Sequence, residues 1–542
     1  MAAGLAGTLL PAFGWLPALG AARPSLDPWR ELLAMPGIGR SVLLTLATGI
    51  AATLLAFAGA VLALAASQGR RRGALLRLVL PLLLAVPHLA SAMGLAFLIA
   101  PSGWLARLLS PWLTGWERPP DLLTVNDPYG IALTLGLALR ECPFLILALQ
   151  AAQSHLPTGT MLAVARMQGH GRVLAWLKLV LPAIYPQIRL PLYAVLAFSL
   201  SVVDMALVLG PTTPPVLSVL LLRWFNDPDL TLRLAASAGA ILQLVLILLA
   251  IGAWRLAERI VAASARPWLT RPASRHVERL LAAAGSLAMA CVVGSGLLGI
   301  AVLAIWSLAW TWRFPAALPQ RWSLDAWSQA ASGLAWLAWT TLLVAVLTTL
   351  LALVLVLACL EREVRAGPKP ERRVLALAYL PLLLPPVSFL FGLQIWFVRL
   401  GLDATWTGLV WTHLVFVLPY VLLLLRAPYL ALDARWAAAG AALGSPPGRI
   451  FRRIRLPLLR RPLAVAAAVG LAVSVAQYLP TLVIGAGRLT TLATETLALT
   501  AGGDRRLAAV AALLLAVLPI LALAAALLVP SPRLGRDHRH GR

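Results

Sequence analysis

The chain contains few charged residues: only 12% of its 542 residues are Asp, Glu, Lys or Arg. Hydrophobic residues make up 61%, and the mean hydropathy is +0.87. Soluble globular domains carry roughly 25% charged residues, so this composition excludes an ordinary soluble protein. Because lipid cannot hydrogen-bond a backbone, the long apolar stretches are expected to cross a membrane as helices.

Lysine is nearly absent, since the chain has only Lys178 and Lys369. A phosphate-binding P-loop ends in Gly-Lys-Ser/Thr, and neither lysine is followed by Ser or Thr. The three cysteines are too scattered for a zinc site or a disulfide framework, and no Ser-His-Asp pattern occurs. The chain is therefore expected to be no enzyme and to bind no metal or cofactor. Energy for any work must come from a separate subunit or from an ion gradient.

The apolar stretches predict an all-α polytopic membrane protein with about twelve spans. Each stretch is about 20 residues long, the length that crosses the hydrocarbon core. The first of them resembles a signal peptide, but it has no charged n-region and is expected to be a retained helix. The expected spans are 4–20, 41–65, 78–100, 129–150, 190–210, 234–254, 281–308, 336–359, 375–398, 408–428, 464–485 and 507–529.

The formal net charge of +25 follows from membrane topology. With a cytoplasmic N-terminus, about two thirds of the Lys and Arg residues fall in the inside loops and the tail. Nucleic-acid binding would require a basic patch on a folded domain, and the chain has no such domain to offer. We therefore expect both termini in the cytoplasm, lipid as a surrounding partner, and no nucleic acid.

One motif occurs twice, 275 residues apart, in basic stretches between apolar spans. The first copy consists of Ala163, Arg166, Gly169, Leu179, Leu181 and Pro182. The second copy consists of Ala438, Ala441, Gly444, Ile454, Leu456 and Pro457. In both copies the proline follows the glycine by thirteen residues. A duplicated loop of this kind indicates that one soluble partner is bound twice.

The duplication extends to whole halves. Ser25–Trp29 recurs as Ser323–Trp327, and Leu80–Leu84 recurs as Leu380–Leu384. Six spans per half is an even number, so the halves are parallel repeats related by an axis along the membrane normal. The expected divisions are a first repeat 1–260, a linker 261–280 with little structure, a second repeat 281–529, and a basic cytoplasmic tail 530–542. The pathway is expected at the interface between the repeats.

Each motif copy predicts a short helix, a turn and an apolar anchor. The small run Ala163–Ala165 allows close packing, and Gly169 permits a turn that is unavailable to residues with a Cβ. Leu181-Pro182 is expected to stop the helix before the next span. The alternative is an amphipathic helix that lies on anionic lipid. The locked spacing of two copies favours the docking of a protein.

This pattern resembles the cytoplasmic loop of ABC-importer permeases, commonly written E-A-A-x3-G-x9-I-x-L-P. Two copies in one chain resemble the fused double permeases of the ferric-iron, thiamine and polyamine importers. The resemblance implies a multi-pass protein of the bacterial inner membrane that works with two copies of an ATPase subunit and with a periplasmic or lipid-anchored solute-binding protein. ATP would be bound by the partner, and each loop would form a coupling helix that docks on it.

The two copies depart from the family pattern in different ways. The leading Glu is Ala163 in one copy and Ala438 in the other, and Arg166 has no counterpart at Ala441. The isoleucine is Leu179 in the first copy. These differences predict unequal contacts of the two halves with the ATPase.

Ionisable groups within the spans are candidates for the pathway, because their desolvation is costly. Glu141 lies beside Arg140 in the fourth span, and Asp204 lies in the fifth, where Gln477 and Tyr478 occupy the comparable helix of the second half. Pairing between helices is the favoured alternative for Arg140 and Glu141. A carboxylate at Asp204 would favour cationic substrates.

Three functions remain open at this point. The first is the membrane subunit of an ATP-driven importer, which forms the pathway and is coupled through two loops. The second is an ion-coupled secondary transporter, which predicts broken mid-span helices and several carboxylates near the midplane. The third is a polytopic enzyme or receptor, for which no catalytic constellation is present. The nature of the substrate stays open.

Overall fold

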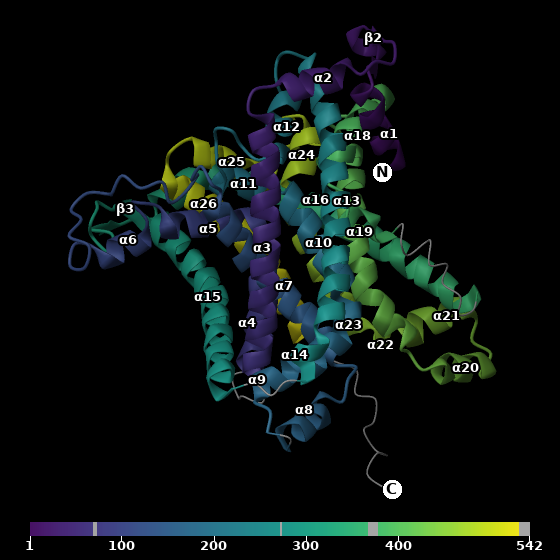
Figure 1. Ribbon diagram of the computed structural model, residues 1–542. Coiled ribbons are helices and arrows are strands. Elements are labelled where there is room, and N and C mark those ends of the chain that lie inside the picture. The colour runs from purple at the N-terminus through teal and green to yellow at the C-terminus, as the bar shows by residue number, and fades with distance from the viewer. Residues whose placement is uncertain (69–72, 168, 271–273, 367–377, 531–542) are drawn as a thin grey trace.

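The computed structural model describes residues 1–68, 73–167, 169–270, 274–366 and 378–530. These residues are almost wholly helical (Figure 1). Their only strands form two short antiparallel ribbons, β1 (Trp15–Leu16) with β2 (Ala21–Ala22) and β3 (Ala309–Thr311) with β4 (Arg321–Trp322). The expected all-α polytopic fold class is confirmed.

Nine helices of the described residues are long and apolar enough to cross a membrane, or ten if one bent pair counts as a span. This is fewer than the twelve that the sequence predicts. Seven of the nine are single helices, and two are composite segments. They are α3 (Ile38–Ser67), α7 (Ile131–Gln153), α13 (Leu232–Ser264), α15 (Arg275–Leu308), α16 (Asp325–Ala366), α19 (Trp406–Leu430), α26 (Arg505–Leu528), His88–Leu109 and Arg172–Ser201.

The prediction of a first span over 4–20 is wrong. The segment forms α1 (Ala2–Ala12), after which Gly14, at a φ of +79°, turns the chain into the β1–β2 ribbon. Eleven residues rise about 16 Å, roughly half of the hydrocarbon core. The expected span 375–398 is also shortened, to the 3₁₀ turn η3 (Leu380–Leu382) and α18 (Val387–Leu400), and its first three residues lie outside the described ones.

Three further spans are broken in the middle. The expected span 78–100 divides into α4 (Gly73–Ala85) and α5 (His88–Ile99), because Pro87 has no N–H to continue the ladder. The expected span 190–210 divides into α10 (Leu181–Ser201) and α11 (Asp204–Leu209), and 464–485 divides into α23 (Arg460–Val475) and α24 (Tyr478–Gly485).

Side chains distant in the sequence stabilise one of these breaks. The hydroxyl of Ser218 donates to the Val202 carbonyl at 2.6 Å, and the Gln243 amide donates to the Leu200 carbonyl at 2.9 Å. A buried carbonyl without a donor is costly, so these two bonds allow α10 to end inside the bundle.

Short helices connect the longer ones, and one of them corrects the expected linker. The described residues of 261–280 are largely helical: α13 extends to Ser264, α14 covers Arg266–Thr270, and α15 begins at Arg275. The short connecting elements, α14 among them, join the longer helices. They are η1 (Pro17–Leu19), α2 (Asp27–Ala34), α6 (Trp104–Leu109), α8 (Thr158–Met167), α9 (Arg172–Ala175), α12 (Leu217–Phe225), α14 (Arg266–Thr270), α20 (Ala434–Ala442), α21 (Pro447–Ile450), α22 (Leu456–Leu458) and α25 (Leu492–Ala501).

The first helix of each expected repeat packs against the other repeat. α1 lies against α18, where the Gly392 N–H donates to the Thr8 hydroxyl at 3.0 Å. α15 lies against α3 and α5, where Gly94 and Gly299 meet so closely that a Cβ on Gly94 would stand 2.9 Å from Gly299. Gly94 and Gly392 are 298 residues apart, so the two contacts occupy comparable positions.

Candidate functional sites

The first copy of the repeated motif lies at the lower end of the molecule in Figure 1, in α8 and the segment that follows it. Gly169 adopts a φ of +83°, a conformation that residues with a Cβ rarely take. Its N–H donates to the Arg166 carbonyl at 3.0 Å, and the His170 N–H donates to the Ala165 carbonyl at 3.1 Å. These bonds close the end of α8 and reverse the chain.

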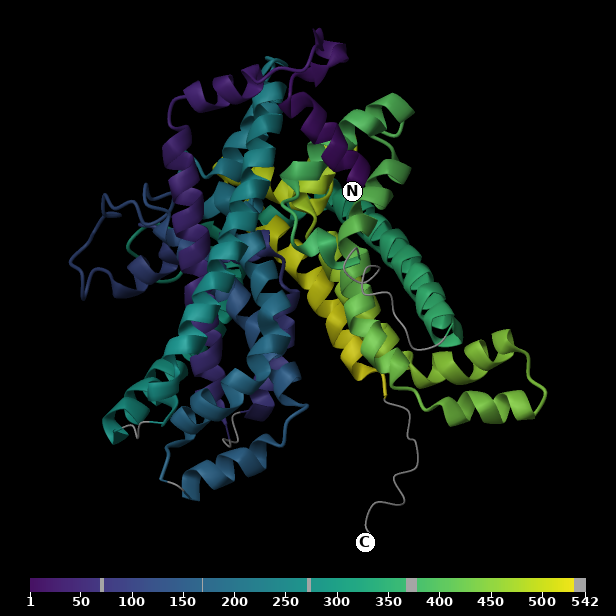
Figure 2. The ribbon, with the colours of Figure 1, turned by 45° about the vertical axis from the view of Figure 1, so that its right-hand side comes forward.

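The second copy repeats this geometry in α20, near the same end of the molecule (Figures 1 and 2). Gly444 adopts a φ of +74°, and its N–H donates to the Ala441 carbonyl at 2.9 Å. The Ser445 N–H donates to the Gly440 carbonyl at 3.0 Å. Both glycines therefore make the turn that the sequence predicts, with equivalent backbone bonds.

A π-helical turn follows each loop, at η2 (Trp176–Val180) and η4 (Phe451–Arg455). The expectation that Leu181-Pro182 stops the helix is wrong, because Arg172–Ser201 continues as one span. Pro182 stands at the start of α10, where a missing N–H costs little. In the second copy the chain does break after Pro457, and the flanking helices meet at 77°. The two loops thus leave the membrane bundle in different ways.

The outer faces of both loops are open. Ala163, Arg166 and Ala438 are exposed, and so are two large apolar side chains at the helix ends. Met167 is 89% exposed and Leu443 is 86% exposed. On the inner side, Gly440 lies against Ile450 and Ile454, where a Cβ would come within 2.8 Å of the Ile454 side chain. Exposed apolar tips on closely packed short helices are typical of protein contact surfaces.

The first loop is held by a residue that the sequence analysis did not identify. Glu278, in the first turn of α15, accepts hydrogen bonds from the N–H groups of Val173 and Leu174 at 2.8 and 3.0 Å. Gly171 leaves room for this carboxylate, since a Cβ there would overlap it at 2.2 Å. Glu278 lies in the expected linker 261–280, at the start of the helix that leads into the second repeat, so this junction between the repeats secures the first loop. No sequence pattern marks Glu278 for this role.

The second loop is held by an ionic network at the end of α16. Glu361 forms ion pairs with Arg365 and Arg455 and accepts a hydrogen bond from the Tyr429 hydroxyl. Glu363 forms an ion pair with Arg426 at 2.7 Å. Arg455 lies in η4, so this network joins the second loop to its own repeat. The two loops therefore differ both in the residues that hold them and in the way that they join the membrane helices.

A polar cluster lies inside the bundle around the expected pathway residues. Glu141 and His88 form a close pair at 3.1 Å, which joins α7 to α5. Arg140 donates to the carbonyls of Leu84 and Val86, both at 2.9 Å, at the break between α4 and α5. Arg140 and Glu141 thus take different partners, so helix–helix pairing accounts for both. His413 likewise pairs with neighbouring helices, because its ring nitrogens lie within hydrogen-bond distance of Ser474 and Thr481.

Asp204 and Tyr478 begin the two short helices that follow the mid-span breaks, α11 and α24. They come from different halves of the chain and occupy comparable positions after the breaks. Gln477 precedes Tyr478 and occupies the N-cap position of α24, where its side chain makes no capping hydrogen bond. Of the four expected pathway residues, Glu141 is paired with His88, while Asp204, Gln477 and Tyr478 stand at the mid-span breaks of the two halves.

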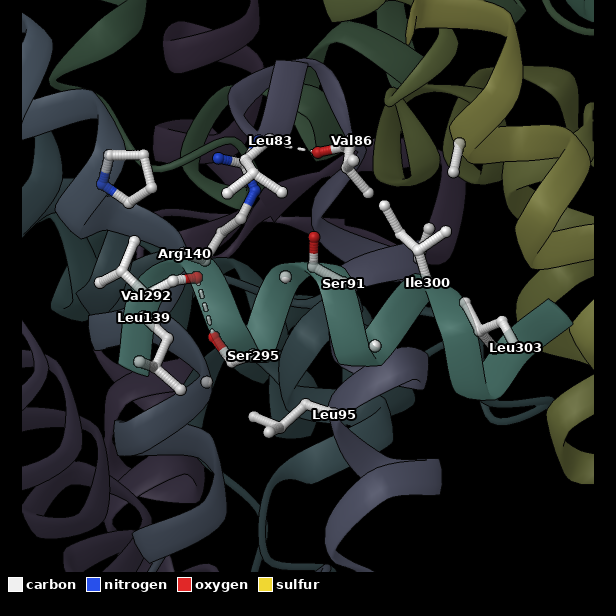
Figure 3. A pocket seen from close by; sticks show the side chains of 16 residues that line it. Leu83, Val86, Ser91, Leu95, Leu139, Arg140, Val292, Ser295, Ile300 and Leu303 are labelled. Carbon is white, nitrogen blue, oxygen red and sulfur yellow. Dashed lines mark hydrogen bonds between the residues drawn. The ribbon is translucent and has the colours of Figure 1, made fainter. Parts of the chain in front are cut away.

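A small cavity of about 50 Å³ adjoins this cluster. Figure 3 shows Arg140 beside Ser91 and Ser295, with its side chain directed toward Leu83 and Val86. The cavity lies between α5, α7 and α15 and is lined mainly by apolar groups. Its size suits one or two water molecules. It does not suit a transported solute.

Comparison with known proteins defines the class. A family model described as "Binding-protein-dependent transport system inner membrane component" matches residues 355–530. The chain is therefore similar to the membrane components of binding-protein-dependent transport systems.

A relative extends this similarity over both halves. The chain is 33% identical over 508 residues to the "Inner membrane ABC transporter permease protein YnjC" of Escherichia coli (strain K12). The match covers 93% of this chain and 91% of the relative. The chain belongs to the ABC transporter permeases, and it is a multi-pass protein of the inner membrane. Membership of this family implies an ATPase partner and a binding protein, and it makes the chain a transport subunit.

Proposed function

We propose that the chain forms the translocation pathway of an ATP-driven importer and is coupled to two copies of a separate ATPase through the two loops. The observation that carries this proposal is the matched geometry of α8 and α20. Both end at a glycine with positive φ, both use the same backbone hydrogen bonds, and both project near the same end of the molecule (Figure 2). ATP would bind to the partner, and a periplasmic or lipid-anchored binding protein would deliver the solute to the opposite end.

The coupling contacts would be made by the motif residues of each loop. In the first loop these are Ala163, Arg166, Gly169, Leu179, Leu181 and Pro182, and in the second Ala438, Gly444, Ile454, Leu456 and Pro457. The unlike supports of the two loops favour unequal contacts: Glu278 reaches the first loop from the expected linker between the repeats, whereas Glu361 holds the second loop from within the second repeat.

The organisation of the chain as a fused double permease belongs to the same proposal. The repeated ribbons, the repeated π-helical turns and the exchange of α1 and α15 support two repeats, 1–260 and 281–529, joined by 261–280. This organisation favours the ferric-iron, thiamine and polyamine group of importers. Residues 531–542 of the expected tail lie outside the described residues.

One contact of α26 bears on which side of the membrane the C-terminus lies. The Arg460 guanidinium donates to the Pro530 carbonyl at 2.8 Å, which places the end of α26 near the second loop. If that loop faces the ATPase, the C-terminus is cytoplasmic. The expectation of a cytoplasmic N-terminus depended on a first span that the structure replaces by α1, and Figure 1 shows the N-terminus away from α8 and α20.

An ion-coupled secondary transporter is the second candidate. The broken helices that it predicts are present, at α10–α11 and α23–α24, and a carboxylate lies beside one of them at Asp204. Family membership outweighs this observation, because broken spans also suit a permease whose pathway lies at the interface between repeats.

The exposed tips of the loops allow a direct test of the coupling proposal. We expect the Met167→Asp and Leu443→Asp changes to weaken co-purification of the ATPase, each about tenfold, because a charge would be buried in an apolar contact. The control is Trp112→Asp, since Trp112 is 73% exposed but lies between α6 and α7. Unchanged co-purification of the ATPase with the Met167→Asp Leu443→Asp double variant would contradict the proposal.

A further inference from the structure

An open groove of about 380 Å³ lies between α16, α23 and α26 in the second half. It follows α23 from Ala464 to Leu471, a rise of about 10 Å, which is most of the depth of one leaflet of the hydrocarbon core. Half of the lining residues are alanines, so small side chains leave the space open. The lining residues are Val346, Thr349, Leu350, Leu353, Ala464, Ala467, Ala468, Leu471, Ala522, Ala525, Ala526 and Val529.

A shared hydrogen bond allows the two halves to be compared residue by residue at this place. The Leu217 N–H donates to the Thr45 hydroxyl at 2.8 Å, and the Leu492 N–H donates to the Thr341 hydroxyl at 2.9 Å. These bonds set an offset of 296 residues between α3 and α16 and of 275 residues between the later helices. The second offset is also that of the loop motif.

In the first half, larger side chains fill the corresponding space. Leu196 and Ile50, the counterparts of Leu471 and Val346, belong to an apolar cluster between α3, α10 and α13. The cluster also contains the counterparts of Ala522, Ala526 and Val529, which are Ile247, Ile251 and Trp254. The groove is therefore a feature of the second half and not a general result of the fold.

One polar group on the wall of the groove has no partner. The Thr349 hydroxyl is buried and makes no hydrogen bond to any described residue. Its counterpart in the filled first half, Thr53, donates to the Gly49 carbonyl at 2.8 Å. An unsatisfied buried hydroxyl is costly, so the chain's own groups do not complete this wall.

Two arginines stand at the end of the groove that lies near the second loop (Figure 2). Arg460 and Arg461 precede Ala464 by one turn of α23, and the Arg460 guanidinium donates to the Pro530 carbonyl at 2.8 Å, directly after Val529. Both arginines are exposed, and no ion pair of Arg461 occurs among the described residues.

This positive charge is also particular to the second half. The counterparts of the two arginines in the first half are Tyr185 and Pro186. Residues 434–494 contain no Asp or Glu, so no acid of this stretch offsets the two charges. The site therefore combines an apolar slot with a cationic end, and basic sites between transmembrane helices bind anionic lipid head groups.

We propose that the groove binds one membrane phospholipid with an anionic head group. An acyl chain lies against the alanines of α23 and α26, and the phosphate group binds Arg461 and Arg460 through charge-assisted hydrogen bonds. The inference goes beyond the proposed function, because it concerns a lipid that stays with the chain and depends on neither the solute nor the ATPase.

The charges argue against a second copy of the chain as the occupant. Copies in one membrane are related by an axis along the membrane normal, so a symmetric contact through the groove would bring both pairs of arginines to the same depth. Like charges that face each other across an interface are unfavourable. An anionic amphiphile meets the same arginines with the opposite charge.

Native mass spectrometry of the delipidated full-length chain in detergent tests the proposal. The probes are dioleoyl phosphatidylglycerol, which is anionic, and dioleoyl phosphatidylcholine, which has the same acyl chains and no net charge. We expect one phosphatidylglycerol to bind at least about fivefold more tightly than phosphatidylcholine. The Arg461→Gln variant should lose this preference. Arg279→Gln, an exposed arginine near the start of α15, is the matched control and should keep it.

A second variant fills the groove with the residues of the first half. The Ala522→Ile Val529→Trp variant should bind both lipids about tenfold more weakly, because the acyl chain loses its place. The control is Ala290→Ile, since Ala290 is exposed on α15. Thermal unfolding establishes that the filled variant is folded, and Arg461→Gln, which changes an exposed side chain, decides the question if it is not.

Three results would overturn the proposal. Equal binding of the two lipids by the wild type would remove the role of the arginines. Unchanged lipid binding by the filled variant would place the lipid elsewhere. A wild-type dimer that the filled variant cannot form would identify a second copy of the chain as the occupant.

Discussion

Single carboxylates determine how several helices of this permease begin. Asp504 caps α26 by accepting the Arg506 N–H at 2.9 Å, and the Arg506 guanidinium approaches the same carboxylate at 3.0 Å. These contacts with Arg506 hold the pKa of Asp504 below its usual range. Glu278 performs a similar role for α9, but it does so from a helix that is more than a hundred residues away in the chain. At this scale the main effect of an acid is to satisfy N–H groups that a helix start leaves open.

The Asp504→Ala variant should lose about 1 kcal/mol of stability, because α26 loses its cap. Since the folded-state pKa of Asp504 is lowered, its contribution is fully present above the unfolded pKa of about 4. The contribution is lost as the pH falls through the lower, folded-state value. Thermal unfolding of the detergent-solubilised protein at pH 7 and at acidic pH measures this, and a stability difference between the variant and wild type that grows on acidification would contradict it.

The Glu278→Gln variant should loosen the start of α9. The carboxylate accepts two hydrogen bonds through two charged oxygens, whereas the amide offers one neutral acceptor oxygen. We expect the amide hydrogens of Val173 and Leu174 to exchange about tenfold faster. The amides of Arg449 and Ile450, which bond to the Pro446 carbonyl in the second loop, are the internal control. Glu117→Gln, an exposed acid of the outer loop, should change neither pair. Slow exchange at Val173 in Glu278→Gln would show that the carboxylate is dispensable.

At the scale of elements, the loop helices share one design and differ in how they join the membrane bundle. α8 and α20 both end in a left-handed glycine and both lead into a π-helical turn. The first then continues straight into α10, whereas the second bends by 77° before α23. A force applied to α8 would therefore pass along one continuous helix, and a force applied to α20 would act across a bend.

A double Gly169→Trp Gly444→Trp variant should uncouple ATP hydrolysis from uptake. A residue with a Cβ costs about 1–2 kcal/mol at these positive φ values, so both turns would open. The Gly159→Ala variant is the control, because Gly159 lies in α8 and a Cβ there meets no atom within 4 Å. Uptake and ATP hydrolysis are measured in reconstituted vesicles. Normal uptake by the double variant would remove the basis for the coupling role of the loops.

At the scale of the whole molecule, the halves are held together by an exchange of their first helices. α1 packs on α18 and α15 packs on α5, with glycines at both crossings, so that the backbones touch. The largest apolar cluster includes residues from both halves, among them Leu89, Phe225, Phe391 and Val510. The two repeats therefore form one unit.

The Gly94→Leu variant should destabilise the protein by about 1–3 kcal/mol, since the side chain would overlap the backbone of Gly299. Gly392→Leu should have a similar effect against α1, where a Cβ would approach Gly4 to 2.0 Å. Gly294→Leu is the matched control on α15, because a Cβ there has no neighbour within 4 Å. Thermal unfolding compares the stability of the three variants. Equal stability of Gly94→Leu and Gly294→Leu would show that α5 and α15 can move apart at this crossing without a loss of stability.

The sequence by itself determined the class of protein, most of the long spans and the two turns. Hydropathy reports whether a segment dissolves in lipid, and the repeated glycines report a backbone conformation that only glycine takes easily. Both are local properties, so α3, α7 and α19 and the turns at Gly169 and Gly444 could be predicted from the residues alone.

Only the tertiary structure decided where the spans break and which charged groups meet. α10 ends at Ser201 because Ser218 and Gln243 satisfy the carbonyls that the break leaves open. α1 stops half-way because it packs on α18 instead of crossing the membrane. Glu278 and the first loop are far apart in the chain, as are His88 and Glu141. Their contacts depend on how distant helices pack, and no local pattern of residues records that packing.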